Sequence, residues 1–255
     1  MGKPPGISAW EHASLRWRRD ITAARTVQYA PERADGMGIE VGMRDQPVNL
    51  QTFLDRLASA APTPGGGAAS AYVAALGAAS VAKVAAVSVG KPKFAAHDAD
   101  LRSHLDHLGS LRDRFLALAA DDESAFATFM QAYRLPKTTD AERAARETAL
   151  QEGMRQAAAV PLRIMAAARE VLDAAEAIAI TGNPNALGDC GAGAAMAVAA
   201  MRVSLLNVTA NIAGLVDGAE VAGYRAQLHD LMDGVADRER VLIETIRRRL
   251  AGEVT

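Results

Sequence analysis

Residues 62–94 read PTPGGGAASAYVAALGAASVAKVAAVSVGKPKF, a proline-glycine loop followed by a helix-length run of small apolar residues. Gly65, Gly66 and Gly67 permit backbone angles that are closed to other residues, and a helix that begins after them points unpaired amide N–H groups toward the loop. Such a helix end attracts anions. The loop is therefore either a tight turn before a core helix or a cradle for a ligand, and the residues alone leave both interpretations open.

Ala, Gly and Ser dominate the run from Ala68 to Ser88, so this helix can approach its neighbours closely. The run is long enough to cross a membrane. Alanine is only weakly apolar, however, Lys83 would be costly in lipid, and no aromatic residues flank the stretch. We expect a central helix of a soluble protein, buried on most faces, and no membrane partner.

Composition points to an all-α protein. The chain has 255 residues, half of them hydrophobic, but aromatic residues make up only 4%. Ala, Leu and Val recur at helical spacing, which predicts a helical bundle. The formal net charge of −2 gives no electrostatic basis for binding nucleic acid. Cys190 is the single cysteine and cannot form an intrachain disulfide, which favours a cytoplasmic location.

Residues 1–48 differ from the rest of the chain. They contain both tryptophans, a basic cluster and scattered Pro and Gly, without the features of a secretory or transit peptide. We expect an extension outside the bundle, disordered or loosely packed, and a helical domain over residues 49–250. Helices are expected from 49 to the Pro62 loop and over 68–88, 95–132, 139–176 and 224–250, with a kink or a break at Pro161.

A second stretch, residues 181–215, repeats the first design: a loop rich in Gly, Asn and Pro leads into a helix of small residues. We expect the bundle to be built around these two helices, packed closely, with their two loops at the same end. The polar residues of this stretch are Asn183, Asn185, Asp189, Asn207 and Asn211. Asp189 is a helix cap or a functional carboxylate. The last two asparagines are four residues apart on one helix face, where they either fix helix register or line a pocket.

Other polar residues carry weaker signals. Lys91 and Lys93 follow the expected end of the first small-residue helix, where they complement the helix dipole or bind carboxylates. His97, His104 and His107 lack the spacing of a zinc signature, so we expect no metal site.

Six motifs, in order, resemble the cyclodeaminase/cyclohydrolase family of folate enzymes over roughly residues 49–250. They are FLDRLASAAPTPGGGAASAYVAALGAA, GKPKF, YRLPKTTDAER, VPL, GNPNALGDCG and LLNVTANI. The family includes the cyclodeaminase half of formimidoyltransferase-cyclodeaminase and stand-alone methenyltetrahydrofolate cyclohydrolases, and it is all-helical and dimeric. The sequence departs from the family pattern at Ala68, Lys83, Pro92, Gly188 and Cys190.

The resemblance implies chemistry at the one-carbon unit between N5 and N10 of tetrahydrofolate, with no cofactor. It implies that Asp189 is the general acid and base, because this residue matches the family's loop aspartate. Residues that would bind the folate are Thr63, Gly65, Gly66 and Gly67 in the glycine loop, Lys91 and Lys93 for the glutamate tail, and Asn183, Asn185, Asn207 and Asn211.

Three functions follow as alternatives. A chain without a formimidoyltransferase domain favours methenyltetrahydrofolate cyclohydrolase, which opens the methenyl ring to give 10-formyltetrahydrofolate. Formimidoyltetrahydrofolate cyclodeaminase, which releases ammonia, is the second. A non-catalytic helical folate-binding or scaffold dimer is the third. In each case the expected partners are a small folate and a second copy of the chain.

Overall fold

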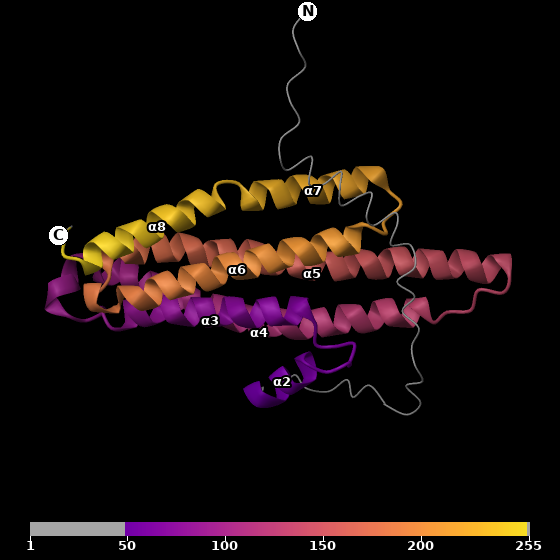
Figure 1. The fold of residues 1–255 in the computed structure, drawn as a ribbon, viewed down its shortest axis with the longest axis horizontal. Helices are drawn as coiled ribbons and strands as arrows, with labels where there is room; N and C mark the ends of the chain where they lie inside the picture. Colours follow the sequence, from indigo (N-terminus) through magenta and orange to yellow (C-terminus); the bar gives the residue numbers. More distant parts are fainter. Residues whose placement is uncertain (1–48, 254–255) are drawn as a thin grey trace, which may run out of the picture. The chain divides into compact units, whose positions relative to one another are not determined.

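The computed structural model of the chain describes residues 49–253, and this part consists of helices joined by turns and loops, without a strand (Figure 1). The prediction of an all-α bundle is therefore confirmed. The predicted extension at 1–48 lies outside the described residues. The helices are α2 (Leu50–Leu57), α3 (Gly66–Ala86), α4 (Asp98–Tyr133), α5 (Asp140–Thr181), α6 (Leu187–Ile212), α7 (Gly218–Met232) and α8 (Val235–Leu250), with short 3-10 helices η1 (Pro92–His97) and η2 (Pro184–Ala186).

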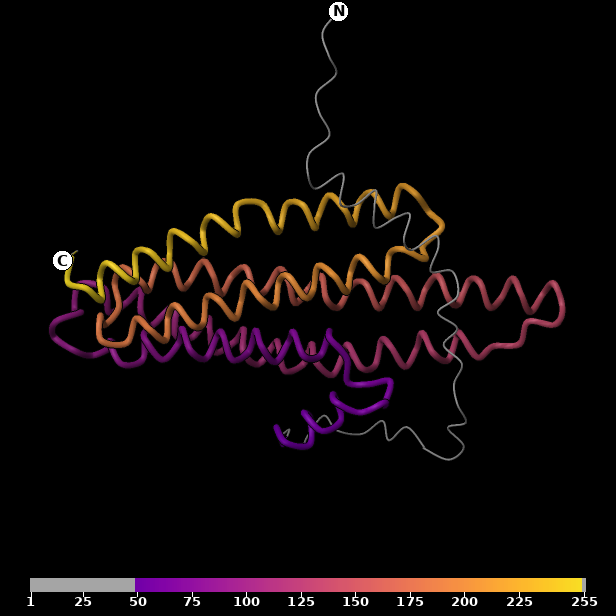
Figure 2. The backbone as a smooth tube through the Cα atoms, in the orientation of Figure 1, coloured from indigo at the N-terminus to yellow at the C-terminus, as the bar shows by residue number. Residues whose placement is uncertain are grey.

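Helices α3, α4, α5 and α6 form a closed ring around one core. α3 packs against α4 and α6, and α5 packs against the same two helices. Short connections join the four in sequence, and each helix runs antiparallel to the one before it (Figure 2). α7 and α8 then run along the outside of α5 and α6. The two small-residue helices, α3 and α6, are adjacent in this ring, as the sequence predicts.

The two small-residue helices touch backbone to backbone at the middle of their contact. A Cβ atom placed on Gly77 would lie 2.8 Å from the carbonyl oxygen of Gly193, and one on Gly193 would lie 2.6 Å from the carbonyl oxygen of Gly77. These distances leave no room for a methyl group. Glycine at both positions is therefore what lets α3 and α6 approach so closely.

Both helices are also long and apolar enough to cross a membrane, judged by length and composition alone. The qualifying segments are Gly66–Ala86 and Pro184–Ile212, and 56% and 50% of their most apolar windows are buried inside the bundle. A core helix of a soluble protein has the same features. The expectation that the chain has no membrane partner stays a prediction.

The sequence placed most helix ends within a few residues. The Thr139 side chain accepts a hydrogen bond from the Glu142 N–H, and the Glu142 side chain accepts one from the Thr139 N–H, which confirms the predicted capping box at the start of α5. Of the kink or break predicted at Pro161, the break is wrong. α5 continues through this residue, which is buried, to Thr181.

The single helix predicted over 224–250 is two helices. Gly234 has a φ of 68°, a left-handed backbone conformation that interrupts the helical path between α7 and α8. The first of the two also begins earlier than expected, at Gly218, where the Asp217 side chain accepts hydrogen bonds from the Ala219 and Glu220 N–H groups. The left-handed Gly234 thus divides the C-terminal segment into α7 and α8.

Candidate functional site

The predicted site residues fall into two groups at opposite ends of α3 and α6. The start of α3 lies against the end of α6, since Gly66 is close to Asn207. The end of α3 lies against the start of α6, where Lys83 pairs with Asp189. Gly66 and Lys83 are seventeen residues apart in α3, or about 25 Å along a helix. The expectation that the two loops lie at the same end is therefore wrong, because the two helices are antiparallel.

The Asp189 end is defined by Lys83, Ser88, Asn183 and Asp189. Asp189 lies in the first turn of α6, and its Oδ2 is 2.8 Å from the Lys83 Nζ. Within residues 49–253 the carboxylate makes no capping hydrogen bond to the backbone. The cap interpretation is thus not supported, and the ammonium group of Lys83 is the partner of this carboxylate.

Two turns lie side by side at the Asp189 end. The Ser88 hydroxyl oxygen accepts a hydrogen bond from the Asn183 N–H (2.8 Å), which ties the end of α3 to the turn before α6. The Asn183 side chain accepts from the Asn185 N–H (3.1 Å) and so closes its own turn. Lys91 and Lys93 follow Ser88 closely in the chain and are exposed. This end therefore carries three exposed ammonium groups, those of Lys83, Lys91 and Lys93.

The glycine-turn end is defined by Thr63, Gly65–Gly67, Asp122 and Asn207. Asp122, from α4, packs directly on the glycines: its Oδ2 accepts a hydrogen bond from the Ala68 N–H (2.9 Å). A Cβ atom on Gly67 would lie 2.0 Å from the Asp122 Oδ1. Gly67 is therefore required for this carboxylate to reach the start of α3.

The position of Asp122 changes its acidity. Burial raises the pKa of its carboxyl to about 6; the Ala68 N–H opposes the rise, and the neighbouring Glu123 adds to it. A carboxyl group with this pKa takes up and releases protons close to neutral pH. It is a functional candidate that was not predicted from the sequence.

Helix α2 contacts this end of the bundle through Arg56 and Phe53. The Arg56 guanidinium is 2.8 Å from the Glu123 Oε2 and also donates to the Thr63 carbonyl oxygen (3.4 Å). Phe53 packs edge-on against Tyr72 of α3, with ring centroids 4.5 Å apart. Burial, followed by Glu123, raises the pKa of the Tyr72 hydroxyl, while Arg56 opposes the rise. Thr63 and the glycines are thus held between α2 and α4.

Of the two predicted asparagines of α6, Asn211 has a structural partner. Its Nδ2 donates to the Ala157 carbonyl oxygen of α5 (2.8 Å). Ala157 lies four residues before Pro161, which has no N–H to give to that carbonyl group. Asn211 therefore supplies the hydrogen bond that the proline cannot make, in agreement with the interhelical alternative. The Nδ2 of Asn207 instead donates to the Val203 carbonyl oxygen of its own helix (3.0 Å).

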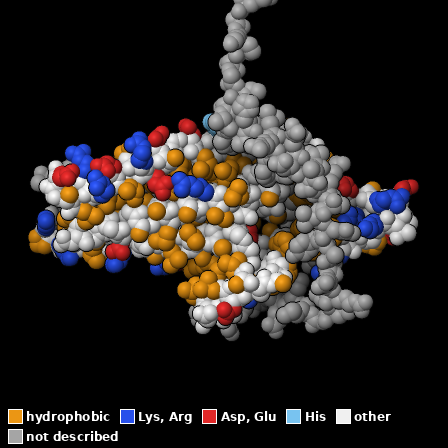
Figure 3. Space-filling view, viewed as in Figure 1, with side chains coloured by type: hydrophobic (Ala, Val, Ile, Leu, Met, Phe, Trp, Pro, Cys, Tyr) orange, Lys and Arg blue, Asp and Glu red, His pale blue; other side chains and the backbone are white. Residues whose placement is uncertain are grey.

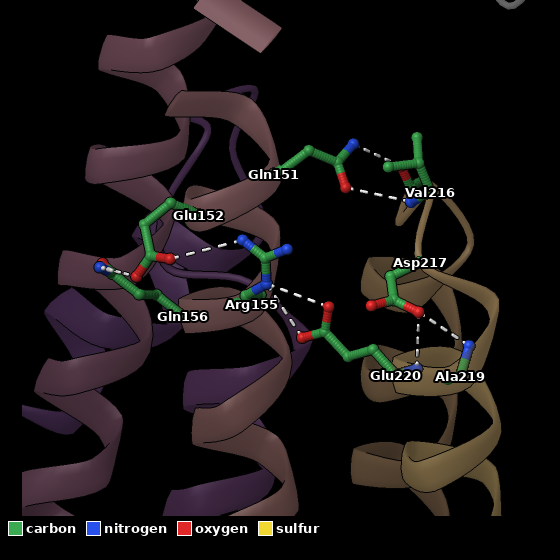
Figure 4. A network of polar contacts seen from close by, with 9 residues as sticks. Gln151, Glu152, Arg155, Gln156, Val216, Asp217, Ala219 and Glu220 are labelled. Carbon is green, nitrogen blue, oxygen red and sulfur yellow. Dashed lines mark hydrogen bonds and ion pairs between the residues drawn. The ribbon is translucent and has the colours of Figure 1, made fainter. Parts of the chain in front are cut away.

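The connection between α6 and α7 is tied to α5 beside Asn211 (Figure 4). The Gln151 side chain accepts from the Val216 N–H (3.1 Å) and donates to the Gly214 carbonyl oxygen (3.0 Å). One turn further along α5, Arg155 forms an ion pair with Glu220 at 3.0 Å. These contacts fix the end of α6, and with it the position of Asn207 next to the glycine turn.

Across residues 49–253, no three His, Cys, Asp or Glu side chains gather in a way that could hold a metal ion. His107 lies 3.1 Å from the Glu170 Oε2 and makes a surface pair. Metal binding gains no support from the described part of the chain.

Comparison with known proteins identifies the family. The sequence model of the formiminotransferase-cyclodeaminase family matches residues 49–230. The chain is also 40% identical over 201 residues, 79% of its own length, to the methenyltetrahydrofolate cyclohydrolase of Methylorubrum extorquens, and it covers 97% of that protein. The chain belongs to the formiminotransferase-cyclodeaminase family.

Some other members of the formiminotransferase-cyclodeaminase family are longer. The formimidoyltransferase-cyclodeaminase of Sus scrofa is 28% identical over 227 residues, which are 89% of this chain but only 41% of that protein. The crystal structure of formiminotetrahydrofolate cyclodeaminase from Thermotoga maritima superposes with a TM-score of 0.67 at 24% identity, over 82% of this chain and 98% of that one. This match shows the shared fold.

Proposed function

We propose that the protein is a methenyltetrahydrofolate cyclohydrolase, which hydrolyses 5,10-methenyltetrahydrofolate to 10-formyltetrahydrofolate. The observation that carries the proposal is the 40% identity to a cyclohydrolase of which the chain covers 97%. Formimidoyltransferase-cyclodeaminases match over less than half of their length. Cyclodeamination with release of ammonia is the alternative reaction of the same site, and a folate-binding dimer without catalysis is the third.

In the proposed reaction Asp189 carries a proton. Water adds to the methenyl carbon, and the hydroxyl group of the resulting intermediate loses a proton as the formyl C=O bond forms. Asp189 accepts that proton and gives it to N5 as the bond between N5 and the one-carbon unit breaks. Lys83, at 2.8 Å, holds the carboxylate in position by charge. We further infer a cytoplasmic enzyme that needs no cofactor.

The substrate is proposed to lie against the glycine turn. The N–H groups at the start of α3, with Thr63 and Asn207, are suited to the polar edges of the pterin. Lys91 and Lys93 are exposed cations and are suited to the carboxylates of the glutamate tail. Asn183 and Asn185 contribute by shaping the turn that precedes Asp189.

A homodimer would bring the Asp189 end of one subunit next to the glycine-turn end of the other. α3 and α6 share an outward face that carries apolar side chains, and hydrophobic atoms gather there in the space-filling view (Figure 3). Leu76 and Leu206 on this face are 57% and 67% exposed. Leu76 is also the middle residue of α3. A twofold axis passing near it would place the partner's Lys83 opposite Ala69, and so the partner's Asp189 beside the glycine turn.

The second copy is the occupant favoured for this face because the proposed site is incomplete without it. Large exposed apolar faces mark interaction surfaces, and a self-complementary face of this kind is what a twofold dimer requires. We therefore propose that each active site combines the glycine-turn end of one subunit with the Asp189 end of the other.

The function is tested with purified protein and two substrates, 5,10-methenyltetrahydrofolate and 5-formimidoyltetrahydrofolate. We expect enzymatic loss of the methenyl chromophore above the uncatalysed rate, and Asp189→Asn should reduce turnover about 10²-fold or more. Asp173→Asn, on the surface of α5, is the control and should leave turnover unchanged.

The same assay separates the alternatives. Ammonia release from the formimidoyl substrate without methenyl hydrolysis would replace cyclohydrolase by cyclodeaminase. Folate binding without turnover of either substrate would favour the non-catalytic dimer.

A further inference from the structure

We infer that Asp122 is a second acid–base group of the proposed reaction, the one that takes a proton from the attacking water. This inference rests on the proposed function and deepens it. Asp122 comes from α4, outside the two stretches, residues 62–94 and 181–215, that carry the residues selected from the sequence. It reaches the glycine turn because Gly67 has no side chain.

The geometry leaves one oxygen of Asp122 free to act. Oδ2 is held by the Ala68 N–H at 2.9 Å, which fixes the carboxylate against the start of α3. Oδ1 accepts no hydrogen bond from the residues that the structure describes. Every fully buried side-chain nitrogen or oxygen in this part of the chain has a hydrogen-bond partner. Oδ1 is therefore not fully buried, and its lone pair can accept a proton from a water molecule.

The charged and titratable groups around Asp122 come from α2, α3, α4 and α5. Glu123, its neighbour on α4, is paired with Arg56 of α2 at 2.8 Å. Asp121, on the other side, is paired with Arg163 of α5 at 3.4 Å. α3 contributes Tyr72, whose hydroxyl pKa is raised by burial. The two neighbouring carboxylates thus have cationic partners, whereas Asp122 has a backbone N–H and a pKa of about 6.

The two carboxylates would move both protons of the attacking water. The water oxygen bonds to the methenyl carbon of the cationic substrate while one water proton moves to Asp122. The second water proton, on the hydroxyl group of the intermediate, passes through the partner's Asp189 to N5 as the carbon–N5 bond breaks. The formyl oxygen is the former water oxygen, and Asp122 returns its proton to solvent. One proton is released in each turnover, and nothing is oxidised or reduced.

The test compares Asp122→Asn with Asp121→Asn, the same substitution one residue earlier. We expect Asp122→Asn to lower kcat about 10²-fold or more, while Asp121→Asn keeps the wild-type value. In wild type, kcat/KM should rise with pH through about 6, because Asp122 accepts a proton only when ionised. Asp122→Asn should lack this rise. Both variants should bind tetrahydrofolate, which has no one-carbon unit to attack, with wild-type affinity.

Each outcome decides one point. If Asp122→Asn keeps the rise near pH 6 and near wild-type turnover, Asp122 only caps α3 and the inference is wrong. If that variant does not fold, the wild-type profile decides, since a flat kcat/KM around pH 6 also overturns the inference. A wild-type protein that does not hydrolyse the methenyl substrate overturns the proposed function, a result that does not depend on either variant.

Discussion

Asn211 and Pro161 lie on different helices and share one carbonyl group. Pro161 leaves the Ala157 carbonyl oxygen without its helical donor, and the Asn211 amide donates to that oxygen at 2.8 Å. The proline is thereby accommodated within an unbroken helix of 42 residues. Asn211, chosen from the sequence as a possible folate-binding residue, thus supplies the hydrogen-bond donor that the backbone of α5 lacks at Pro161.

The pairing predicts a coupling between the two positions. Asn211→Ala should lower the free energy of unfolding by about 1–3 kcal/mol, the cost of leaving a polar group unpaired. In a Pro161→Ala background the new N–H serves the Ala157 carbonyl group, so the same substitution should cost less. Urea unfolding of the four proteins in a double-mutant cycle measures the difference. Asn207→Ala is the control and should show the same cost in both backgrounds.

At the residue scale, the helix and the face on which a polar residue lies could be predicted from the sequence. The partner that each polar residue contacts could not. The four-residue spacing placed Asn207 and Asn211 on one helix, which is correct. It could not say that one of them serves a carbonyl group freed by a proline fifty residues earlier. Asp122 was not among the site residues predicted from the sequence, because periodicity alone does not tell which of three consecutive acidic residues, 121 to 123, meets a glycine of another helix.

Among the elements, α3 and α6 depend most on close backbone approach. Gly193→Ala would place a methyl group 2.6 Å from both the Gly77 carbonyl oxygen and a Val81 methyl group. Overpacking of this kind costs about 1–3 kcal/mol, which outweighs the gain of up to about 1 kcal/mol from replacing glycine by alanine within a helix. We therefore expect Gly193→Ala to be destabilised in urea unfolding.

Gly109 supplies the matched control. It lies within α4, and nothing lies within 4 Å of the Cβ atom that alanine would add. Gly109→Ala should be as stable as wild type or slightly more stable. Equal effects at both positions would show that helix propensity, and not the contact between α3 and α6, decides stability at Gly193.

At the element scale, the positions of the helices could be predicted from the sequence, but their relative directions could not. Small-residue composition identified α3 and α6 as the central pair, and the capping box located the start of α5. Three reversals of the chain separate α3 from α6, since α4 and α5 lie between them. An odd number of reversals makes the pair antiparallel. The two similar loops therefore lie at opposite ends of the helix pair. This arrangement follows from the topology and could not be predicted from the similarity of the two loops.

At the scale of the whole molecule, the proposed dimer predicts that a variant that cannot dimerise also loses most of its activity. Leu206→Asp would place a charge on the apolar face of α6 and should give a monomer by light scattering, with little activity. Leu116→Asp, on the exposed side of α4, is the control and should remain dimeric. A monomeric wild type at micromolar concentration would contradict the proposed dimer.

Mixing two inactive variants tests whether the subunits share their sites. A mixed dimer of Asp122→Asn and Asp189→Asn contains one site with both substitutions and one site with neither. Random mixing should then recover about a quarter of wild-type activity for a twofold dimer. No recovery would show that each chain contains a complete site of its own.

The closed ring of four helices also has a consequence for the kinetics of folding. Three of its contacts join helices that are consecutive in the chain, and such local contacts form rapidly. The fourth, between α3 and α6, closes a loop that contains all of α4 and α5 and carries the largest loop entropy. This contact is expected to form after the folding transition state. Strain introduced at Gly193 should accordingly accelerate unfolding more than it slows folding.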